Sequence, residues 1–111
     1  MRIDYDGKRF RTEGDTSPDG CVALYRQDGD LLSAQFSGGH VRRGALAGTC
    51  APDGTLQFAY CMVETDGEVI SGRCVSTPAL LADGRVRLHE VWERYGAHAA
   101  RGESWLEEVV A

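Results

Sequence analysis

Paired cysteines, prolines and long apolar runs are all scarce in this chain, and each absence excludes a class of protein. The 111 residues contain only three prolines and four cysteines, with no Cys-x-x-Cys pair. Cysteines so widely spaced lack the usual zinc and thiol-redox motifs, so we expect buried free thiols, no metal site and no cofactor. The cysteines are Cys21, Cys50, Cys61 and Cys74.

Membrane and nucleic-acid signals are missing as well. No apolar run reaches the roughly 20 residues of a membrane-spanning helix, and the opening MRIDYDGKRF lacks the apolar segment of a signal peptide. The 12 Lys and Arg side chains are outnumbered by 17 Asp and Glu, which gives a formal net charge of −5. Nucleic acids and anionic membranes attract cationic surfaces, so both are disfavoured as partners. We expect a cytoplasmic protein.

Glycine, by contrast, is abundant. The chain has 14 glycines, about twice the usual frequency, and many follow an aspartate. Asp-Gly dipeptides supply the positive φ angles of two-residue hairpin turns. They fall at Asp6-Gly7, Asp19-Gly20, Asp28-Gly29, Asp53-Gly54, Asp66-Gly67 and Asp83-Gly84. Together with the chain length, they predict one all-β domain over residues 1–111.

The segments between the turns alternate apolar and polar side chains, as half-buried strands do. In residues 55–64 one face carries two aromatic and two aliphatic side chains, and we assign that face to the core. Gly44 and Gly48 inside residues 41–50 indicate bends or close backbone approach, as at the corners of a barrel. The expected strands cover residues 21–27, 31–36, 41–50, 55–64, 68–76, 85–95 and 103–110, after a short opening hairpin or bent strand within residues 3–12.

Two of these segments also fit a helix. Residues 85–95 show helical as well as strand spacing, and in residues 103–110 Ser104 with Glu107 three residues on could begin a helix. Because Asp83-Gly84 leads directly into the first segment, we predict a strand there, and we predict a strand for the second as well. Thr77-Pro78 should end the pairing of the preceding strand, because proline cannot donate to a ladder. Eight or nine strands in series leave two exposed edges, and pairing the first with the last removes them. We therefore predict a small antiparallel up-and-down β-barrel.

Several short motifs carry a family resemblance. They are SGG (37–39), GxLxG (44–48), DGxLxFxY (53–60), GRCVSTP (72–78), DGRVRLHEVW (83–92) and GES (102–104). In these motifs nearly the whole chain resembles a family of small bacterial proteins commonly labelled N-acetylglutamate synthase. The resemblance implies a calycin-like or avidin-like antiparallel β-barrel. The family pattern has a second aromatic two residues after the tryptophan, where this chain has Arg94.

The synthase label itself has no support in the residues. An acetyltransferase of the usual acyl-CoA-binding fold needs a glycine-rich loop that opens a helix, whose free backbone N–H groups hold the pyrophosphate. The nearest match is residues 35–40 (QFSGGH), which end in histidine with no helix following. We do not expect that activity.

The sequence offers one polar group for the barrel interior above others. Glu90 alternates with Leu88 and Trp92, so its carboxylate should point inward. It either forms a structural ion pair with Arg73, as a buried charge requires, or anchors a ligand in a cavity, where an arginine receives an anionic group beside aromatic walls. The candidate ligand-binding residues are Tyr60, Arg73, Arg87, Glu90, Trp92 and Glu107.

Three functions are compatible with this pattern. The first is the binding of a small apolar or amphipathic ligand inside the barrel. The second is a structural or interaction module, for example a homodimer, whose outer face pairs with a partner. The third is an enzyme in which Glu90 and Glu107, both expected to point inward, act as an acid/base pair. A Cys74–His89 nucleophile pair on adjacent strands is a further catalytic alternative.

Overall fold

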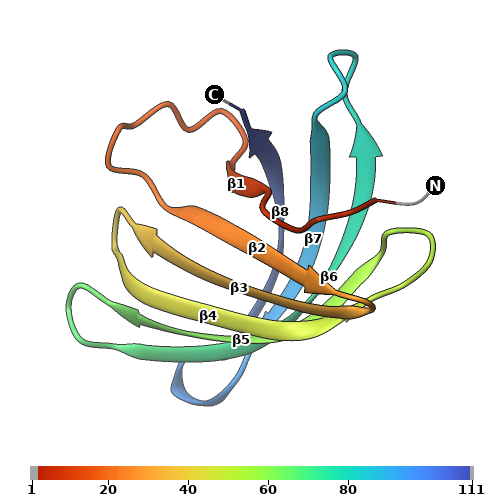
Figure 1. The fold of residues 1–111 in the computed structure, drawn as a ribbon. Helices are drawn as coiled ribbons and strands as arrows, with labels where there is room; N and C mark the ends of the chain where they lie inside the picture. The colour runs from red at the N-terminus through yellow and green to blue at the C-terminus, as the bar shows by residue number, and fades with distance from the viewer. Residues whose placement is uncertain (1–2, 111) are drawn as a thin grey trace.

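The computed structural model describes residues 3–110 as a closed antiparallel barrel of eight strands in chain order, with β1 paired to β8 (Figure 1). The predicted all-β class and up-and-down barrel are confirmed. None of the helical structure among residues 3–110 is suited to crossing a bilayer. The elements are β1 (Arg9–Thr12), β2 (Val22–Asp28), β3 (Leu31–Gly38), β4 (Val41–Cys50), β5 (Leu56–Glu64), β6 (Val69–Leu80), β7 (Val86–Arg94), the 3₁₀ turn η1 (Gly96–His98) and β8 (Ala100–Val109).

Asp-Gly dipeptides lie at the loops of four hairpins, β2–β3, β4–β5, β5–β6 and β6–β7, and most of these loops are longer than two residues. In the β4–β5 loop the Ala51 N–H donates to the carbonyl of Thr55, and the Gly54 N–H donates back to Ala51. Such three-residue loops need a glycine of positive φ at their third position, and Gly54 has φ 89°. Gly20 is the exception among the Asp-Gly glycines, since its φ is not positive.

Strand β6 runs through Pro78, and the prediction that pairing would stop there was wrong. Ser71 and Leu81 both hydrogen-bond to the β7 side, and alternate residues of a strand bond to opposite neighbours. Pro78 therefore turns its missing N–H toward β5, whose pairing with β6 already ends at Ser76. No ladder bond is lost, which is the condition under which a strand tolerates proline.

The two segments for which a helix was the alternative, residues 85–95 and 103–110, form strands β7 and β8. Strand β7 pairs with β6 and β8 along its length, and β8 pairs with β7 and β1. In a closed barrel each of these segments has two neighbours that satisfy its backbone groups, so the pairing outweighs the helical spacing.

The core fills one half of the barrel. Tyr5, Phe10 and Tyr25 are at most 1% exposed and form an aromatic cluster, with ring centroids 4.8 Å apart for Phe10 and Tyr25. The Tyr5 hydroxyl donates to the carbonyl of Gly54 at 2.7 Å, which fastens the segment before β1 to the β4–β5 loop. That end of the barrel is thereby packed with side chains.

Candidate functional site

A cavity of about 290 Å³ occupies the other half of the barrel. Its deeper lining includes Tyr25 and Glu90, and it reaches the β3–β4 loop, where the exposed His40 lines it. Most of the lining is apolar. Val41 and Met62, which also line the cavity, belong to a second, smaller buried cluster with Ile70.

Three aromatic rings form much of the cavity wall, and each faces a glycine on the next strand. The cross-strand pairs are Phe36–Gly44, Tyr60–Gly72 and Trp92–Gly102. A Cβ at Gly102 would lie 2.4 Å from the Trp92 ring, and one at Gly44 would lie 2.1 Å from the Phe36 ring. Each ring therefore packs against the backbone of a glycine, where no side chain intervenes, and the cavity beside the ring stays open.

The Glu90 carboxylate is the polar group on the deeper side of the cavity. It accepts hydrogen bonds from the Ser76 hydroxyl at 3.2 Å and from the Cys74 thiol at 3.5 Å. Burial raises the pKa of Glu90 above its ordinary value, and these two donors partly oppose that rise. The inward orientation expected for Glu90 is observed, and the group can both accept and, once protonated, donate a hydrogen bond.

The model of the family described as "Avidin-like protein" matches residues 3–109. The chain belongs to the avidin-like family. The curated proteins and the solved structures show no match to it. The family match gives no evidence for the N-acetylglutamate synthase label.

Three of the predicted site residues line the cavity of this avidin-like protein. Tyr60 comes from β5, and Glu90 and Trp92 come from β7. The Trp92 indole N–H donates to the Ser104 hydroxyl at 3.0 Å, which fixes the ring over Gly102. Whether these side chains bind a ligand stays a prediction.

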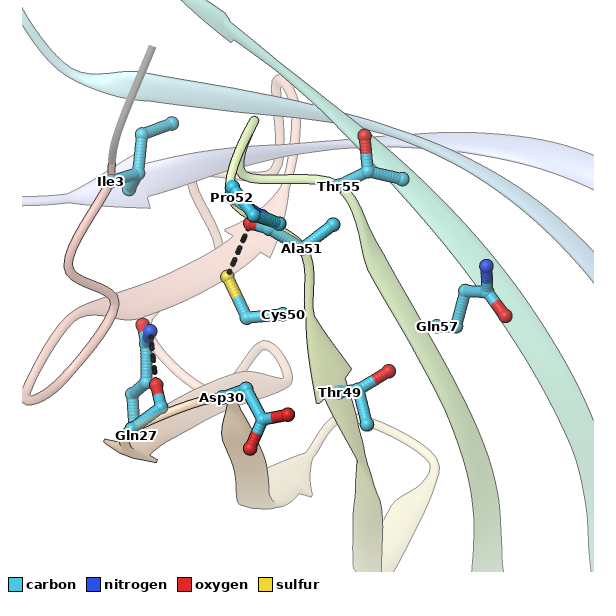
Figure 2. Close-up of a pocket in the computed structure, with 10 residues that line it drawn as sticks. Ile3, Gln27, Asp30, Thr49, Cys50, Ala51, Pro52, Thr55 and Gln57 are labelled. Atoms are coloured by element: carbon cyan, nitrogen blue, oxygen red, sulfur yellow. Dashed lines mark hydrogen bonds between the residues drawn. The ribbon is translucent and has the colours of Figure 1, made fainter.

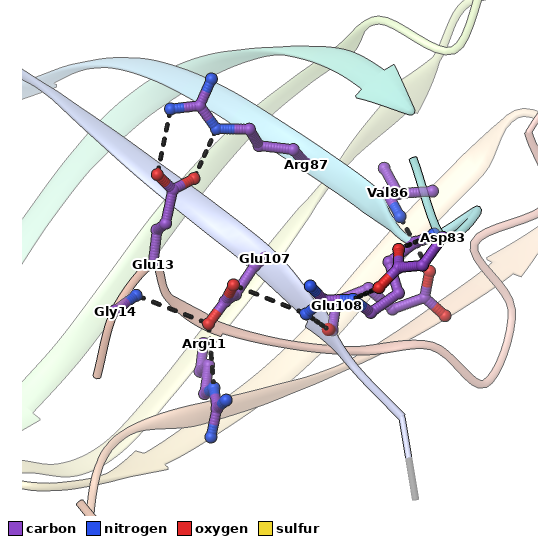
Figure 3. Close-up of polar contacts among 9 residues, drawn as sticks. Arg11, Glu13, Gly14, Asp83, Val86, Arg87, Glu107 and Glu108 are labelled. Carbon is purple, nitrogen blue, oxygen red and sulfur yellow. Dashed lines mark hydrogen bonds and ion pairs between the residues drawn. The ribbon is translucent and has the colours of Figure 1, made fainter. Parts of the chain in front are cut away.

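Arg73 and Arg87 lie on the outside of the barrel, contrary to expectation. Arg73 pairs with Glu93 at 3.3 Å, so the anticipated ion pair with Glu90 is not formed. Arg87 makes a bidentate pair with Glu13 (Figure 3). Their strand neighbours point inward, and adjacent side chains in a strand must point to opposite faces. Neither arginine can receive an anion inside the barrel.

Glu107 is also outside, and its neighbour Glu108 takes the inward position. Leu106 pairs across strands with the fully buried Leu88, which sets the facing of β8. Glu107 then contacts Arg11 at 3.4 Å on the outer surface (Figure 3). Glu108 is 8% exposed and accepts a hydrogen bond from the Val86 N–H at 3.0 Å.

In each of the two catalytic pairs that the sequence suggested, Glu90 with Glu107 and Cys74 with His89, the two residues lie on opposite faces of the sheet. Glu90 and Glu107 lie on opposite faces of the sheet and cannot share a substrate. His89 stacks on Trp105 on the outer face, with ring centroids 4.9 Å apart, whereas Cys74 is buried inside. Burial, and next the nearby Glu90, raise the pKa of the Cys74 thiol far above its ordinary value, which removes the thiolate that a nucleophile needs.

The cavity includes an arginine that the sequence reasoning did not select. Arg94 lies two residues beyond Trp92 on β7 and lines the cavity with it. The signal was present, because positions 88, 90, 92 and 94 share one strand face.

A second hollow, of about 430 Å³, lies near the packed end of the barrel (Figure 2). Its lining is polar and includes Gln27, Asp30, Thr49 and Gln57. The Gln27 side chain is already engaged, since it accepts from the Tyr5 N–H at 2.9 Å and donates to the Gly29 carbonyl at 3.0 Å. With no aromatic wall, this hollow is the weaker candidate for a ligand.

The buried carboxylate predicts a pH dependence of stability. A folded-state pKa raised above the unfolded value means that the folded protein holds the Glu90 proton more tightly, so stability falls as pH rises through the two pKa values. We expect Glu90→Gln to become more stable relative to wild type between pH 4 and pH 8. Urea unfolding at each pH measures the difference.

Asp30→Asn is the matched control, because the Asp30 side chain is exposed in the turn between β2 and β3. The stability of this variant relative to wild type should not rise with pH. If the stability difference between wild type and Glu90→Gln stays constant over this range, burial does not raise the pKa of Glu90.

Proposed function

We propose that the protein binds a small apolar or amphipathic molecule in the cavity of the barrel. The observation that carries this proposal is the set of three aromatic rings, each lying over a glycine so that the space in front of it stays open. A chain under selection for packing alone would fill such space, because an empty cavity is destabilising. Avidin-like barrels commonly bind small ligands, which supports the proposal.

The size and lining of the cavity define the ligand class. A volume of about 290 Å³ corresponds to roughly ten water molecules and lies near the lower end of the range for ligand pockets. Aromatic rings contribute apolar contact area, whereas Glu90 offers a hydrogen-bonding group on the deeper side. The ligand is therefore small, mostly apolar, and polar at a few positions.

Filling the cavity tests the proposal. Ala23 lines the cavity from β2, and Ala23→Phe would place a ring in it. We expect wild type to bind the neutral probe 2-naphthalenemethanol in isothermal titration calorimetry, and Ala23→Phe to bind it about tenfold more weakly or worse, a loss of about 1.4 kcal/mol.

Ala59→Phe is the control, because Ala59 lies on the outer face of β5 and is exposed. It should bind the probe as wild type does. Equal binding by wild type and a folded Ala23→Phe would place the probe elsewhere and refute the proposal.

A homodimer remains a second proposal, supported by one feature of the outer surface. Val75 and Val91 are cross-strand partners on β6 and β7, and they are 42% and 52% exposed. Adjacent exposed valines supply the apolar contact that an interface uses. Sedimentation equilibrium of the protein alone tests for self-association. The cytoplasmic location and the exclusion of nucleic-acid partners likewise stay predictions.

A further inference from the structure

Arg94 has an unsatisfied donor beside the cavity. Its Nε is buried and has no hydrogen-bond partner, and no other buried side-chain nitrogen or oxygen among residues 3–110 is in that state. The guanidinium carbon lies 5.2 Å from the centroid of the Trp92 ring. A buried donor without an acceptor is costly, and an acceptor supplied by a ligand would remove that cost.

No carboxylate of the described chain neutralises this arginine. The ion pairs within residues 3–110 include Arg73, Arg85 and Arg87 but not Arg94. Glu90, the carboxylate of the cavity, is instead hydrogen-bonded to Ser76 and Cys74. The cavity therefore contains one positive charge without a counter-ion.

Tyr60 adds a second donor at the same place. Burial raises the pKa of the Tyr60 hydroxyl, and the nearby Arg94 guanidinium partly opposes that rise. The Tyr60 phenol has an O–H to donate and an oxygen that can accept. Guanidinium and phenol donors side by side suit a planar carboxylate, which can accept from both.

We propose that the ligand is a small aromatic or otherwise apolar monocarboxylate, with its carboxylate bound by Arg94 and Tyr60 and its apolar part against Trp92 and Phe36. This assignment rests on the proposed function of the same cavity. A single guanidinium matches a single negative charge, and the net charge of −5 disfavours ligands of higher negative charge. Arg94 is then the residue that selects the ligand.

The experiment compares two probes that share one ring system. We expect wild type to bind 2-naphthoate about tenfold tighter than 2-naphthalenemethanol in isothermal titration calorimetry, as a charge-assisted hydrogen bond provides. Arg94→Met keeps an unbranched apolar side chain at this position and removes the guanidinium charge, so this variant should bind the two probes equally. Arg43→Met, at an exposed position of β4, should keep the wild-type preference.

Tyr60→Phe gives a second measurement that does not depend on the folding of Arg94→Met. It should reduce the preference for the carboxylate severalfold while leaving the affinity for the alcohol nearly unchanged. Equal binding of the two probes by wild type, or an undiminished preference in folded Arg94→Met or in Tyr60→Phe, overturns the monocarboxylate assignment and leaves the cavity as a site for neutral ligands. Failure of wild type to bind either probe overturns both proposals.

Discussion

Phe10→Ala is expected to lower the free energy of unfolding by about 4 kcal/mol. Phe10 is 1% exposed and packs against Tyr25 and Tyr5, so its loss leaves a cavity and removes two aromatic contacts. It also lies in β1, a strand of only four residues that closes the barrel between β2 and β8. Urea or thermal unfolding followed by circular dichroism measures the loss.

Leu24→Ala provides the comparison for this substitution. Leu24 sits on the neighbouring strand β2, but its side chain points outward and is 38% exposed. Its truncation should cost about 1 kcal/mol or less. If Phe10→Ala costs no more than Leu24→Ala, the packed half of the barrel does not depend on this ring.

Gly48→Ala is expected to cost about 3 kcal/mol, because the added carbon would meet backbone and not a movable side chain. An ideal Cβ at Gly48 lies 1.9 Å from the Gln57 carbonyl oxygen and 2.5 Å from the Phe58 Cα. Strands β4 and β5 would have to separate, and the inward curvature of the wall would be lost there. The same unfolding assay measures this effect.

Ala47→Val is the matched control for Gly48→Ala. It adds side-chain carbon on the same strand at the preceding, exposed position, where a β-branched residue suits a strand. The control should be neutral within about 0.5 kcal/mol. A neutral Gly48→Ala would show that the two strands can separate freely at this bend.

Much of the fold could be predicted because its signals are local. Except for Gly20, the glycines of the Asp-Gly dipeptides have positive φ, and Gly54, Gly67 and Gly84 all have φ between 88° and 89°. Alternation along each segment then places the strands. Pro78 was misjudged because its effect depends on where the neighbouring β5 ends, which is not a local property.

Whether an individual side chain points into or out of the barrel depends on pairing with distant strands. In β8, alternation alone allows either Glu107 or Glu108 to point inward. The pairing of Leu106 with the buried Leu88 decides that Glu108 is the inward residue. Arg73 was assigned inward to neutralise Glu90, but Ser76 and Cys74 satisfy that carboxylate instead. The interior can stabilise a carboxylate with hydroxyl and thiol donors, and composition gives no sign of that.

The order of the strands has a consequence for how the chain folds. Apart from the β1–β8 ladder, every ladder joins strands that are consecutive in the chain. The β1–β8 contact links residues as far apart as Lys8 and Glu108, a sequence separation of 100. Bringing such distant segments together costs conformational entropy before any contact compensates for it. We therefore expect a curved, open sheet to assemble first from neighbouring hairpins, with ring closure as the slow final event.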